Sequence, residues 1–274
     1  MNEYLEKIIE NELPVIQYDL FSKLDFVEHG FTTRLGGVSE GIFSTMNLSF
    51  TRGDNPEHVM RNYEIIAEHT GFDKNLFVAS HQTHTTNTRI VTREDAGKGI
   101  VREKDYEDID GLITSEKGMM LFTYYADCVP LFFADPVKKV VAVSHSGWKG
   151  TAHRMGKVTV DRMCEEFGCD RKDIVCAIGP SICQSCYEVS EDLVEEFSKS
   201  YSQEEIEMIF EPREHHKYHL DLWKANEIVL RSAGILPEHI ENRKICTCCN
   251  REILFSHRAT QGKRGNLAAY IGIK

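Results

Sequence analysis

One apolar run, residues 119–150, constrains the fold of this chain more than any other segment. It contains three strand-like stretches, MMLFTYY, VPLFFA and VVAVSH, which are short and rich in apolar side chains. The sequence DPVK at residues 135–138 is typical of a tight turn, because proline has the backbone angle that the first central position needs. The run therefore predicts a hairpin between its second and third strands.

The predicted hairpin brings a cysteine and a histidine together. With a two-residue loop, Cys128 lies directly opposite His145, and opposed residues have Cβ atoms about 4.5–5.5 Å apart. Such a pair can bind one metal ion, or the imidazole can deprotonate the thiol. A bulge in the turn would shift this register, and a cysteine in an apolar strand commonly belongs to the core. The polar flanks, Asp127 before the cysteine and SGWKG after the histidine, favour a functional site at the strand ends.

Length, charge and cysteine content limit the class of protein. The chain of 274 residues is long enough for one large domain or two small ones. Its net charge of −11 argues against nucleic acid as the main partner, because phosphate backbones are bound by clustered Lys and Arg. It has no run of eighteen apolar residues, so we expect no membrane span, and the acidic N-terminal segment lacks the features of a signal peptide. Nine cysteines without an export signal favour a cytoplasmic protein with free thiols or metal ligands.

The order of the predicted elements indicates the fold class. Residues 54–56 (DNP) are a helix start, Gly71 is a helix end, and an apolar stripe of Val59, Tyr63, Ile66 and Ala67 lies between them. Helices and strands are interspersed, yet several strands are joined by hairpins. This favours an α+β domain with mixed β-sheets over a parallel doubly wound sheet.

Two chemistries compete for the Cys128–His145 pair. With His84, which stands at H-x-x-H spacing from His81, the pair makes a three-ligand metal site. Catalytic zinc usually has three protein ligands and an open fourth position, where a water becomes a nucleophile near neutral pH. Alternatively, a metal-free dyad uses the thiolate of Cys128 to attack a carbonyl. A trinuclear copper centre needs many imidazoles, and the H-x-H pairs that usually mark it are missing from this chain.

A second cluster of cysteines is a separate candidate. The spacing C-x-x-C, followed much later by two adjacent cysteines, is a candidate for a structural zinc site, although adjacent cysteines depart from the usual paired spacing. The four residues are Cys183, Cys186, Cys248 and Cys249. Free thiols at strand ends are the alternative, and the role of Cys246 stays open with theirs.

Eight blocks of the sequence resemble the YfiH/laccase-domain (YlmD-like) family, also labelled polyphenol oxidase or purine nucleoside phosphorylase. They are HGFTTRLGGVS, MNLSF, SHQTHTT, DGLIT, YYADCVPLFF, VSHSGWKG, AIGPSICQSCYEV and SHRATQGKRGNLAAYIGI. The most specific is A-D-C followed, after sixteen residues, by H-x-G-W. The resemblance spans about residues 25–274 and implies four layers, α/β/β/α, in a single domain of residues 1–274. Residues 1–25 are then an N-terminal extension of that domain.

The resemblance also implies a metal and an activity. It implies zinc held by the His of Q-x-H, the Cys of A-D-C and the His of H-x-G-W, which here are His84, Cys128 and His145. Thr85 stands where many members have glycine, and Ser146 where many have alanine. Members are described as phosphorolysing adenosine, inosine, guanosine and methylthioadenosine and as deaminating adenosine, so purine nucleosides and phosphate are the expected partners. The older name reflects copper-dependent phenol oxidation, which the missing H-x-H pairs disfavour.

The aligned blocks supply further candidate residues. Zinc deaminases use a carboxylate as proton shuttle, and Asp127 is the candidate beside the catalytic Cys128, unless it only orders the backbone. Arg34, next to a Gly-Gly turn, is the candidate anion binder for phosphate. Asn47 and Arg258 are the other candidates for substrate binding. A solvated surface position is the alternative for all three of these substrate residues.

Two other classes of function stay open. A metal-free Cys-His hydrolase or deamidase predicts activity that survives chelation and is lost on thiol alkylation. A metal-binding accessory protein of division or envelope metabolism predicts bound zinc without nucleoside turnover. The open coordination position of a three-ligand site favours an enzyme.

Overall fold

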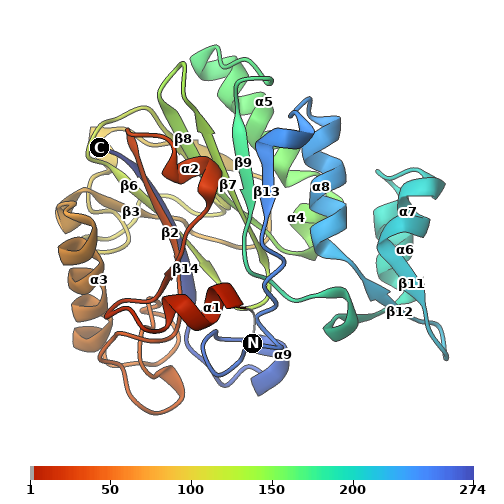
Figure 1. Ribbon diagram of the computed structural model, residues 1–274, viewed down its shortest axis with the longest axis horizontal. Coiled ribbons are helices and arrows are strands. Elements are labelled where there is room, and N and C mark those ends of the chain that lie inside the picture. The colour runs from red at the N-terminus through yellow and green to blue at the C-terminus, as the bar shows by residue number, and fades with distance from the viewer. Residues whose placement is uncertain (1–2) are drawn as a thin grey trace.

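Two β-sheets packed face to face form the centre of the computed structural model, which describes residues 3–274 (Figure 1). The first sheet has the order β1 (Val15–Ile16), β2 (Val27–Thr32), β14 (Leu267–Ile273), β6 (Met120–Tyr125) and β3 (Phe77–Ala79). The second has the order β13 (Ile240–Asn242), β9 (Val175–Ile178), β7 (Val129–Asp135), β8 (Val140–Ser146), β5 (Gly111–Thr114) and β4 (Thr88–Ile90). Both sheets mix parallel and antiparallel pairs.

Helices cover the outer face of each sheet. The first sheet carries α3 (Pro56–Thr70), and the second carries α4 (Trp148–Ala152), α5 (Met155–Phe167) and α8 (Leu222–Ser232) on its opposite side (Figure 1). Separate apolar clusters fill the three spaces between these layers. The predicted α+β class and the α/β/β/α layering are therefore confirmed.

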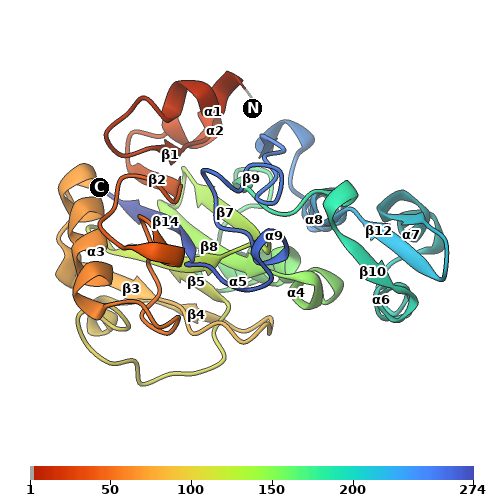
Figure 2. The ribbon, with the colours of Figure 1, turned by 90° about the horizontal axis from the view of Figure 1, so that it is seen from below.

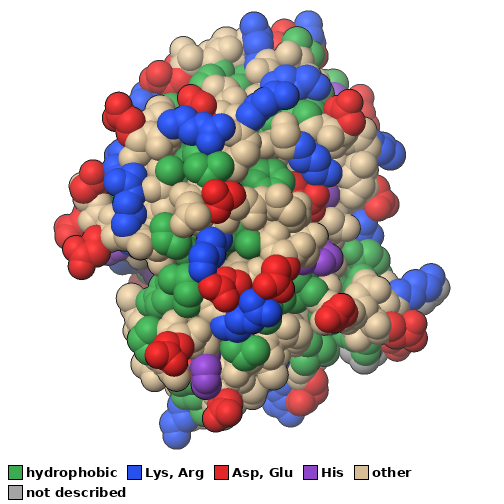
Figure 3. Space-filling view, turned by 90° about the vertical axis from the view of Figure 1, so that its left-hand side faces the viewer, with side chains coloured by type: hydrophobic (Ala, Val, Ile, Leu, Met, Phe, Trp, Pro, Cys, Tyr) green, Lys and Arg blue, Asp and Glu red, His purple; other side chains and the backbone are tan. Residues whose placement is uncertain are grey.

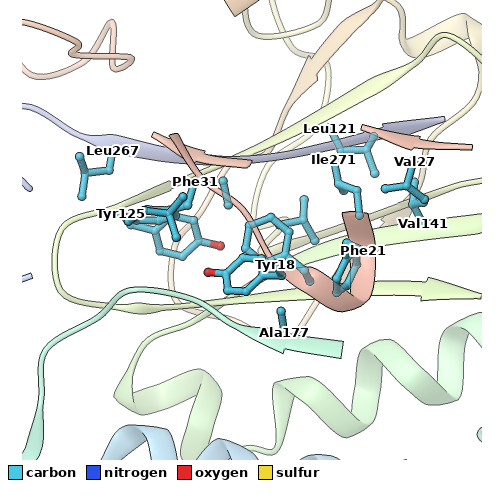
Figure 4. Close-up of a cluster of buried hydrophobic side chains, with 14 of the residues drawn as sticks. Tyr18, Phe21, Val27, Phe31, Leu121, Tyr125, Val141, Ala177, Leu267 and Ile271 are labelled. Carbon is cyan, nitrogen blue, oxygen red and sulfur yellow. The ribbon is translucent and has the colours of Figure 1, made fainter. Parts of the chain in front are cut away.

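The space between the two sheets holds an extensive apolar cluster. Strand side chains alternate between the two faces of a sheet, so every second residue of the central strands points into this space. The first sheet contributes Phe31, Leu121, Tyr125 and Ile271, which face Val141 and Ala177 of the second (Figure 4). The short helix α2 (Asp19–Ser22) adds Phe21 to the same cluster. Burying one such side chain contributes about 1.5–3 kcal/mol, and this cluster holds the sheets together.

The helix that covers the first sheet begins and ends as its sequence predicts. The side chain of Asn55 accepts a hydrogen bond from the backbone N–H of Glu57, which satisfies one free donor of the first turn. Gly71 ends the helix in the left-handed conformation, at φ 73°. Of the predicted stripe, Val59, Tyr63 and Ile66 are fully buried against the sheet, and Ala67 is partly buried.

The central hairpin forms, but its predicted register is wrong by two residues. Pro130, not Cys128, lies opposite His145, and the loop between the strands has four residues, 136–139. The carboxylate of Asp135 accepts backbone hydrogen bonds from residues 137 and 138, which stabilises this wider loop. Side chains alternate with a period of two, so the shift leaves Cys128 and His145 on the same face.

A crossover between the sheets precedes the hairpin. The chain leaves the first sheet at Tyr125 and enters the second at Val129, so Ala126–Cys128 links the two. Asp127 adopts φ 92° in this link, a left-handed conformation that a non-glycine residue rarely takes. Cys128 therefore lies where the ends of both sheets meet.

A small third sheet projects from the main body (Figure 2). It has the order β10 (Glu188–Ser190), β12 (Lys217–Leu220) and β11 (Phe210–Pro212), and it lies beside α6 (Glu191–Ser198) and α7 (Gln203–Ile209). The remaining helices are α1 (Glu3–Ile8) and α9 (His257–Thr260). On the side of the molecule that carries α3, basic and acidic side chains are interspersed (Figure 3). Within residues 3–274, none of the helices has the length and apolar character needed to cross a membrane.

Candidate active site

His84, Cys128 and His145 come together where the ends of the two sheets meet. Their ligand atoms all lie within 4.8 Å of one another, and Cys128 Sγ is 4.0 Å from His84 Nε2. The two imidazole rings are nearly perpendicular, with centroids 4.9 Å apart. His145 lies on β8, Cys128 in the crossover, and His84 in the loop after β3 at φ 68°. Two nitrogens and one sulfur thus converge on one point.

A buried carboxylate, Asp110, organises this cluster. It accepts a hydrogen bond from His145 Nδ1 at 2.7 Å, which leaves Nε2 of that ring as the free ligand atom. It also accepts the backbone N–H groups of Thr83, His84 and Thr85, so the same carboxylate shapes the loop that carries His84. Metal-binding histidines are commonly oriented by a carboxylate in this way.

The turn after β8 leaves room for the cluster only because it contains a glycine. A Cβ atom at Gly147 would lie 3.0 Å from both Cys128 Sγ and His84 Cδ2. The H-x-G-W block therefore supplies a ligand and, two residues later, the absence of a side chain that would crowd it.

Proton equilibria in the cluster favour a charged pair. Burial raises the pKa of a thiol, but the positive charge and hydrogen bond of His145, and then His84, lower the pKa of Cys128 to about 6. Burial lowers the pKa of an imidazole, but Cys128 and Asp110 together raise that of His145 to about 9. Burial acts to raise the pKa of Asp110, but the hydrogen bond and charge of His145, together with the backbone N–H groups of Thr85 and Thr83, lower this pKa overall. Around neutral pH the cluster thus favours a thiolate, the form of cysteine that binds metals or attacks electrophiles.

This donor set fits a single metal ion. One thiolate and two imidazoles, with a carboxylate behind one of them, match a zinc site that has three protein ligands and one open position. Residues 3–274 contain one other group of three or more cysteine, histidine or acidic side chains whose ligand atoms lie this close together. It consists of four cysteines.

The cluster lies in the wall of a cavity of about 370 Å³. Basic side chains line the same cavity, namely Arg52, Lys104 and Arg264, together with the partly buried aromatic residues Phe50 and Tyr124. A volume of this size is at the lower end of the range of small-molecule sites. The cavity therefore combines a candidate metal site with positive charge and aromatic surface.

Two of the basic side chains are held by their surroundings. Arg264 donates to the backbone of Gly265 and the side chain of Asn266, while its buried Nε has no hydrogen-bond partner among residues 3–274. Burial and the nearby Arg52 lower the pKa of Arg264 to about 10, which leaves it charged at neutral pH. Lys104 Nζ donates to the carbonyl of Ser80, and burial lowers the pKa of Lys104. Such restrained cations can bind an anion with little loss of side-chain entropy.

The two predicted arginines do not reach this cavity. Arg34 donates to the carbonyls of Ser44 and Arg251, and its guanidinium lies 4.7 Å from the centre of the Phe255 ring. Arg258 donates to the carbonyls of Cys186 and Glu188. Neither arginine is among the described residues that line the cavity, and their substrate roles stay predictions.

The other two predicted residues hold loops together. The carboxylate of Asp127 accepts hydrogen bonds from the Thr247 hydroxyl at 2.6 Å and from the Arg258 backbone N–H at 2.7 Å. The side chain of Asn47 is buried and accepts a hydrogen bond from the backbone N–H of Asn266, a residue of the cavity wall. Both arrangements order the backbone beside the site. A proton-shuttle role for Asp127 and direct substrate contact by Asn47 stay predictions.

Sequence reasoning missed Asp110 and the basic side chains of the cavity. The pair Asp110-Gly111 marks a strand edge, but nothing local indicates that its carboxylate bonds to a histidine on another strand. Arg264 belongs to the last aligned block, SHRATQGKRGNLAAYIGI, and that block was the available signal for it. Arg52 and Lys104 carry no such mark.

Residues 28–274 match a family model described as multi-copper polyphenol oxidoreductase laccase. The chain belongs to this family. A relative from Bacillus subtilis, named purine nucleoside phosphorylase YlmD, is 36% identical over 252 residues, which are 89% of this chain and 88% of the relative. A protein from an unknown prokaryotic organism, named adenosine deaminase RL5, is 33% identical and covers 86% of this chain and 92% of its own length. The resemblance inferred from the sequence blocks is thus confirmed.

A solved structure confirms the fold. The crystal structure of the hypothetical protein YfiH from Bacillus licheniformis has a TM-score of 0.92 to this chain, with 32% identity. It covers 97% of this chain and 98% of its own. The α/β/β/α arrangement described above is therefore shared with a protein of known structure.

Proposed function

We propose that this laccase-family protein is a zinc-dependent purine nucleoside enzyme. It phosphorolyses adenosine, inosine, guanosine and methylthioadenosine, and it deaminates adenosine. The observation that carries this proposal is that His84, Cys128 and His145 open into the same cavity as Arg52, Lys104 and Arg264. The relatives named purine nucleoside phosphorylase and adenosine deaminase support the substrate class.

Each part of the cavity has a distinct task in this proposal. Zinc held by the three ligands would supply Lewis-acid chemistry. Asp110 keeps the proton on Nδ1 of His145, so that Nε2 faces the metal position. Arg264 and its neighbouring cations bind phosphate by charge-assisted hydrogen bonds, and Phe50 and Tyr124 present aromatic surface to the base.

The ligand set supports zinc over copper in this proposal. Within residues 3–274, the cluster around Cys128 contains two imidazoles, those of His84 and His145. A trinuclear copper centre would need more. Copper-dependent polyphenol oxidation remains the alternative that the family's description names. We also propose a cytoplasmic location, which the nine free cysteines support.

Chromatography of reaction products tests the proposal. Purified protein is incubated with adenosine, with and without phosphate. Adenine that forms only with phosphate demonstrates phosphorolysis, and inosine that forms without phosphate demonstrates deamination. Adenosine that stays intact under both conditions, in protein loaded with stoichiometric zinc, contradicts the proposal. A phenol oxidation assay with added copper then tests the alternative.

Arg264→Met is expected to impair phosphorolysis more than deamination. Charge-assisted hydrogen bonds contribute about 1.5–3 kcal/mol, so the KM for phosphate is expected to rise roughly 10- to 100-fold. Deamination uses water in place of phosphate, and its rate is expected to change little. Arg34→Met is the matched control, because Arg34 lies outside the cavity. If Arg34→Met raised the KM for phosphate and Arg264→Met did not, phosphate would be bound elsewhere.

A metal-free hydrolase is a second candidate that one observation favours. Cys128, His145 and Asp110 have the order of a nucleophile, its base and the carboxylate that orients the base. In this alternative, activity survives exhaustive chelation and is lost on treatment with iodoacetamide. Activity that disappears with the metal and returns on adding zinc contradicts it.

A further inference from the structure

Four cysteines form a second cluster on the loops that follow β9 and β13. The sulfur atoms of Cys183, Cys186, Cys246 and Cys249 all lie within 4.8 Å of one another. The set differs from the sequence-based one, because Cys246 takes the place of Cys248. The chain turns back on itself after Cys246, so positions 246 and 249 face the cluster together, whereas Cys248 packs against the apolar cluster outside the second sheet. The cluster is thus two C-x-x-C motifs, the usual paired spacing of structural zinc sites.

The sulfur separations match those of a tetrahedral metal site. With Zn–S bonds of about 2.3 Å, tetrahedral geometry places neighbouring sulfurs about 3.8 Å apart. Here Cys249 Sγ is 3.9 Å from Cys183 Sγ and 3.5 Å from Cys186 Sγ. Disulfide-bonded sulfurs lie about 2.05 Å apart, much closer than these sulfurs. The four cysteines are therefore arranged around a common centre and not as bonded pairs. All four are free thiols.

Burial and the neighbouring Cys183 thiol raise the pKa of Cys246 to about 12, and two backbone N–H groups act in the opposite direction. The N–H groups of Cys183 and Cys249 both point at Cys246 Sγ, at 3.3 and 3.4 Å. Hydrogen bonds of this kind stabilise a thiolate and orient it as a ligand. The guanidinium of Arg258 is fixed on the carbonyl of Cys186, which places a positive charge beside the cluster. Cys246 is buried and Cys249 is exposed, so the cluster is anchored on one side and accessible to an entering ion on the other.

We propose that Cys183, Cys186, Cys246 and Cys249 bind a second zinc ion, with a structural role. Four thiolates leave no open coordination position, which is the pattern of structural zinc. On binding, each thiol that is protonated releases its proton as its sulfur bonds to the metal, and no oxidation or reduction takes place. The inference stands independently of the proposed function, because none of the four cysteines is among the described residues that line the cavity.

The position of this cluster explains what the ion would hold. The two loops are joined by a bridge between Ser181 and Cys246. Each loop also bonds to Asp127: the N–H of Ile182 donates to its carbonyl at 3.0 Å, and the hydroxyl of Thr247 to its carboxylate at 2.6 Å. Asp127 directly precedes Cys128. A zinc ion here therefore fastens the loops that fix the crossover on which the candidate active-site thiol stands.

Metal analysis of the 274-residue chain and its cysteine variants tests the proposal. The Cys128→Ala protein, which lacks an active-site ligand, is expected to retain one zinc per chain, and the Cys128→Ala/Cys249→Ser protein none. Cys249 is chosen because it is exposed, so serine is expected to leave the fold intact. Cys248→Ser is the matched control: it removes the adjacent thiol and is expected to retain the same zinc content as the unmodified chain.

The outcomes separate this proposal from the proposed function. A Cys128→Ala protein without zinc, or one whose zinc survives Cys249→Ser, overturns the four-cysteine site. A disulfide between Cys186 and Cys249, found by mass spectrometry in metal-free protein purified without oxidant, overturns it as well. A third outcome separates the two proposals: the unmodified chain holds one zinc ion, the Cys128→Ala protein keeps it, and the Cys249→Ser protein loses it. The four-cysteine site is then supported, and the proposal of an active-site zinc is contradicted.

Cobalt substitution gives a readout that does not depend on counting metal. Cobalt bound by four thiolates absorbs much more strongly in the near ultraviolet, through sulfur-to-metal charge transfer, than cobalt bound by one. The Cys128→Ala protein loaded with cobalt is expected to show this strong band, and Cys249→Ser is expected to lower it in the same background. A Cys128→Ala protein in which cobalt produces no such band contradicts the four-thiolate ligand set.

Discussion

Cys128→Ala is expected to remove one metal ion per chain and to lower nucleoside turnover more than a hundredfold. The thiolate is one of three ligands, and the metal supplies the Lewis-acid chemistry of the proposed reaction. The fold is expected to survive, because replacing one half-buried sulfur costs about 1 kcal/mol, little compared with the stability of a typical domain. Metal analysis, product chromatography and thermal unfolding measure the three effects.

A cysteine remote from the cavity controls for the loss of a thiol. Cys164 is partly buried on α5, against the apolar cluster outside the second sheet, and Cys164→Ala is expected to keep both metal and activity. A Cys128→Ala protein with the metal content of the unmodified chain would contradict the ligand assignment. Loss of activity with full metal content would instead favour Cys128 as a nucleophile.

Asp110→Asn is expected to weaken binding of the active-site metal by roughly 10- to 100-fold, the usual effect of removing a carboxylate behind a metal-binding histidine. The amide cannot accept from His145 Nδ1 and from the loop N–H groups with equal strength, so both His145 and His84 lose part of their orientation. Competition with a chelator of known zinc affinity measures the change. Because Asp110 acts through His145, saturating zinc is expected to restore part of kcat.

Asp108→Asn is the matched control for this substitution. Asp108 lies two residues away and accepts a hydrogen bond from the Thr83 hydroxyl, but it has no bond to either imidazole in the described chain. Its replacement is expected to change zinc affinity by less than about threefold. Equal losses in the two variants would assign the effect to the shape of the loop. Unchanged affinity in Asp110→Asn would exclude the carboxylate as the group that orients His145.

Elements with strong local signals were predictable from the sequence. The helix after Asn55 forms as expected because its cap, its apolar stripe and the glycine that ends it act over short distances. The hairpin of β7 and β8 was also predictable, but its register was not. Asp135 bonds to the backbone of the loop and selects four loop residues where the sequence suggested two.

The candidate site divides in the same way. His84, Cys128 and His145 were found because the resemblance carries them in specific blocks, and the structure brings their ligand atoms together. Asp110 was not found, because its bond to His145 joins separate strands and leaves no trace in local spacing. Arg34 was favoured for its Gly-rich neighbourhood, yet tertiary packing directs its guanidinium to backbone carbonyls outside the cavity.

The sequence by itself determined the family, the layered α+β fold and the three convergent ligands, since these follow from local propensity and from motifs that are read residue by residue. Only the tertiary structure decided which side chains share a space. It placed Arg264 beside the metal ligands and put Cys246, not Cys248, with the other three cysteines. The physical reason is that the direction of a side chain in a loop depends on backbone angles and on contacts with distant segments, which spacing along the chain does not encode.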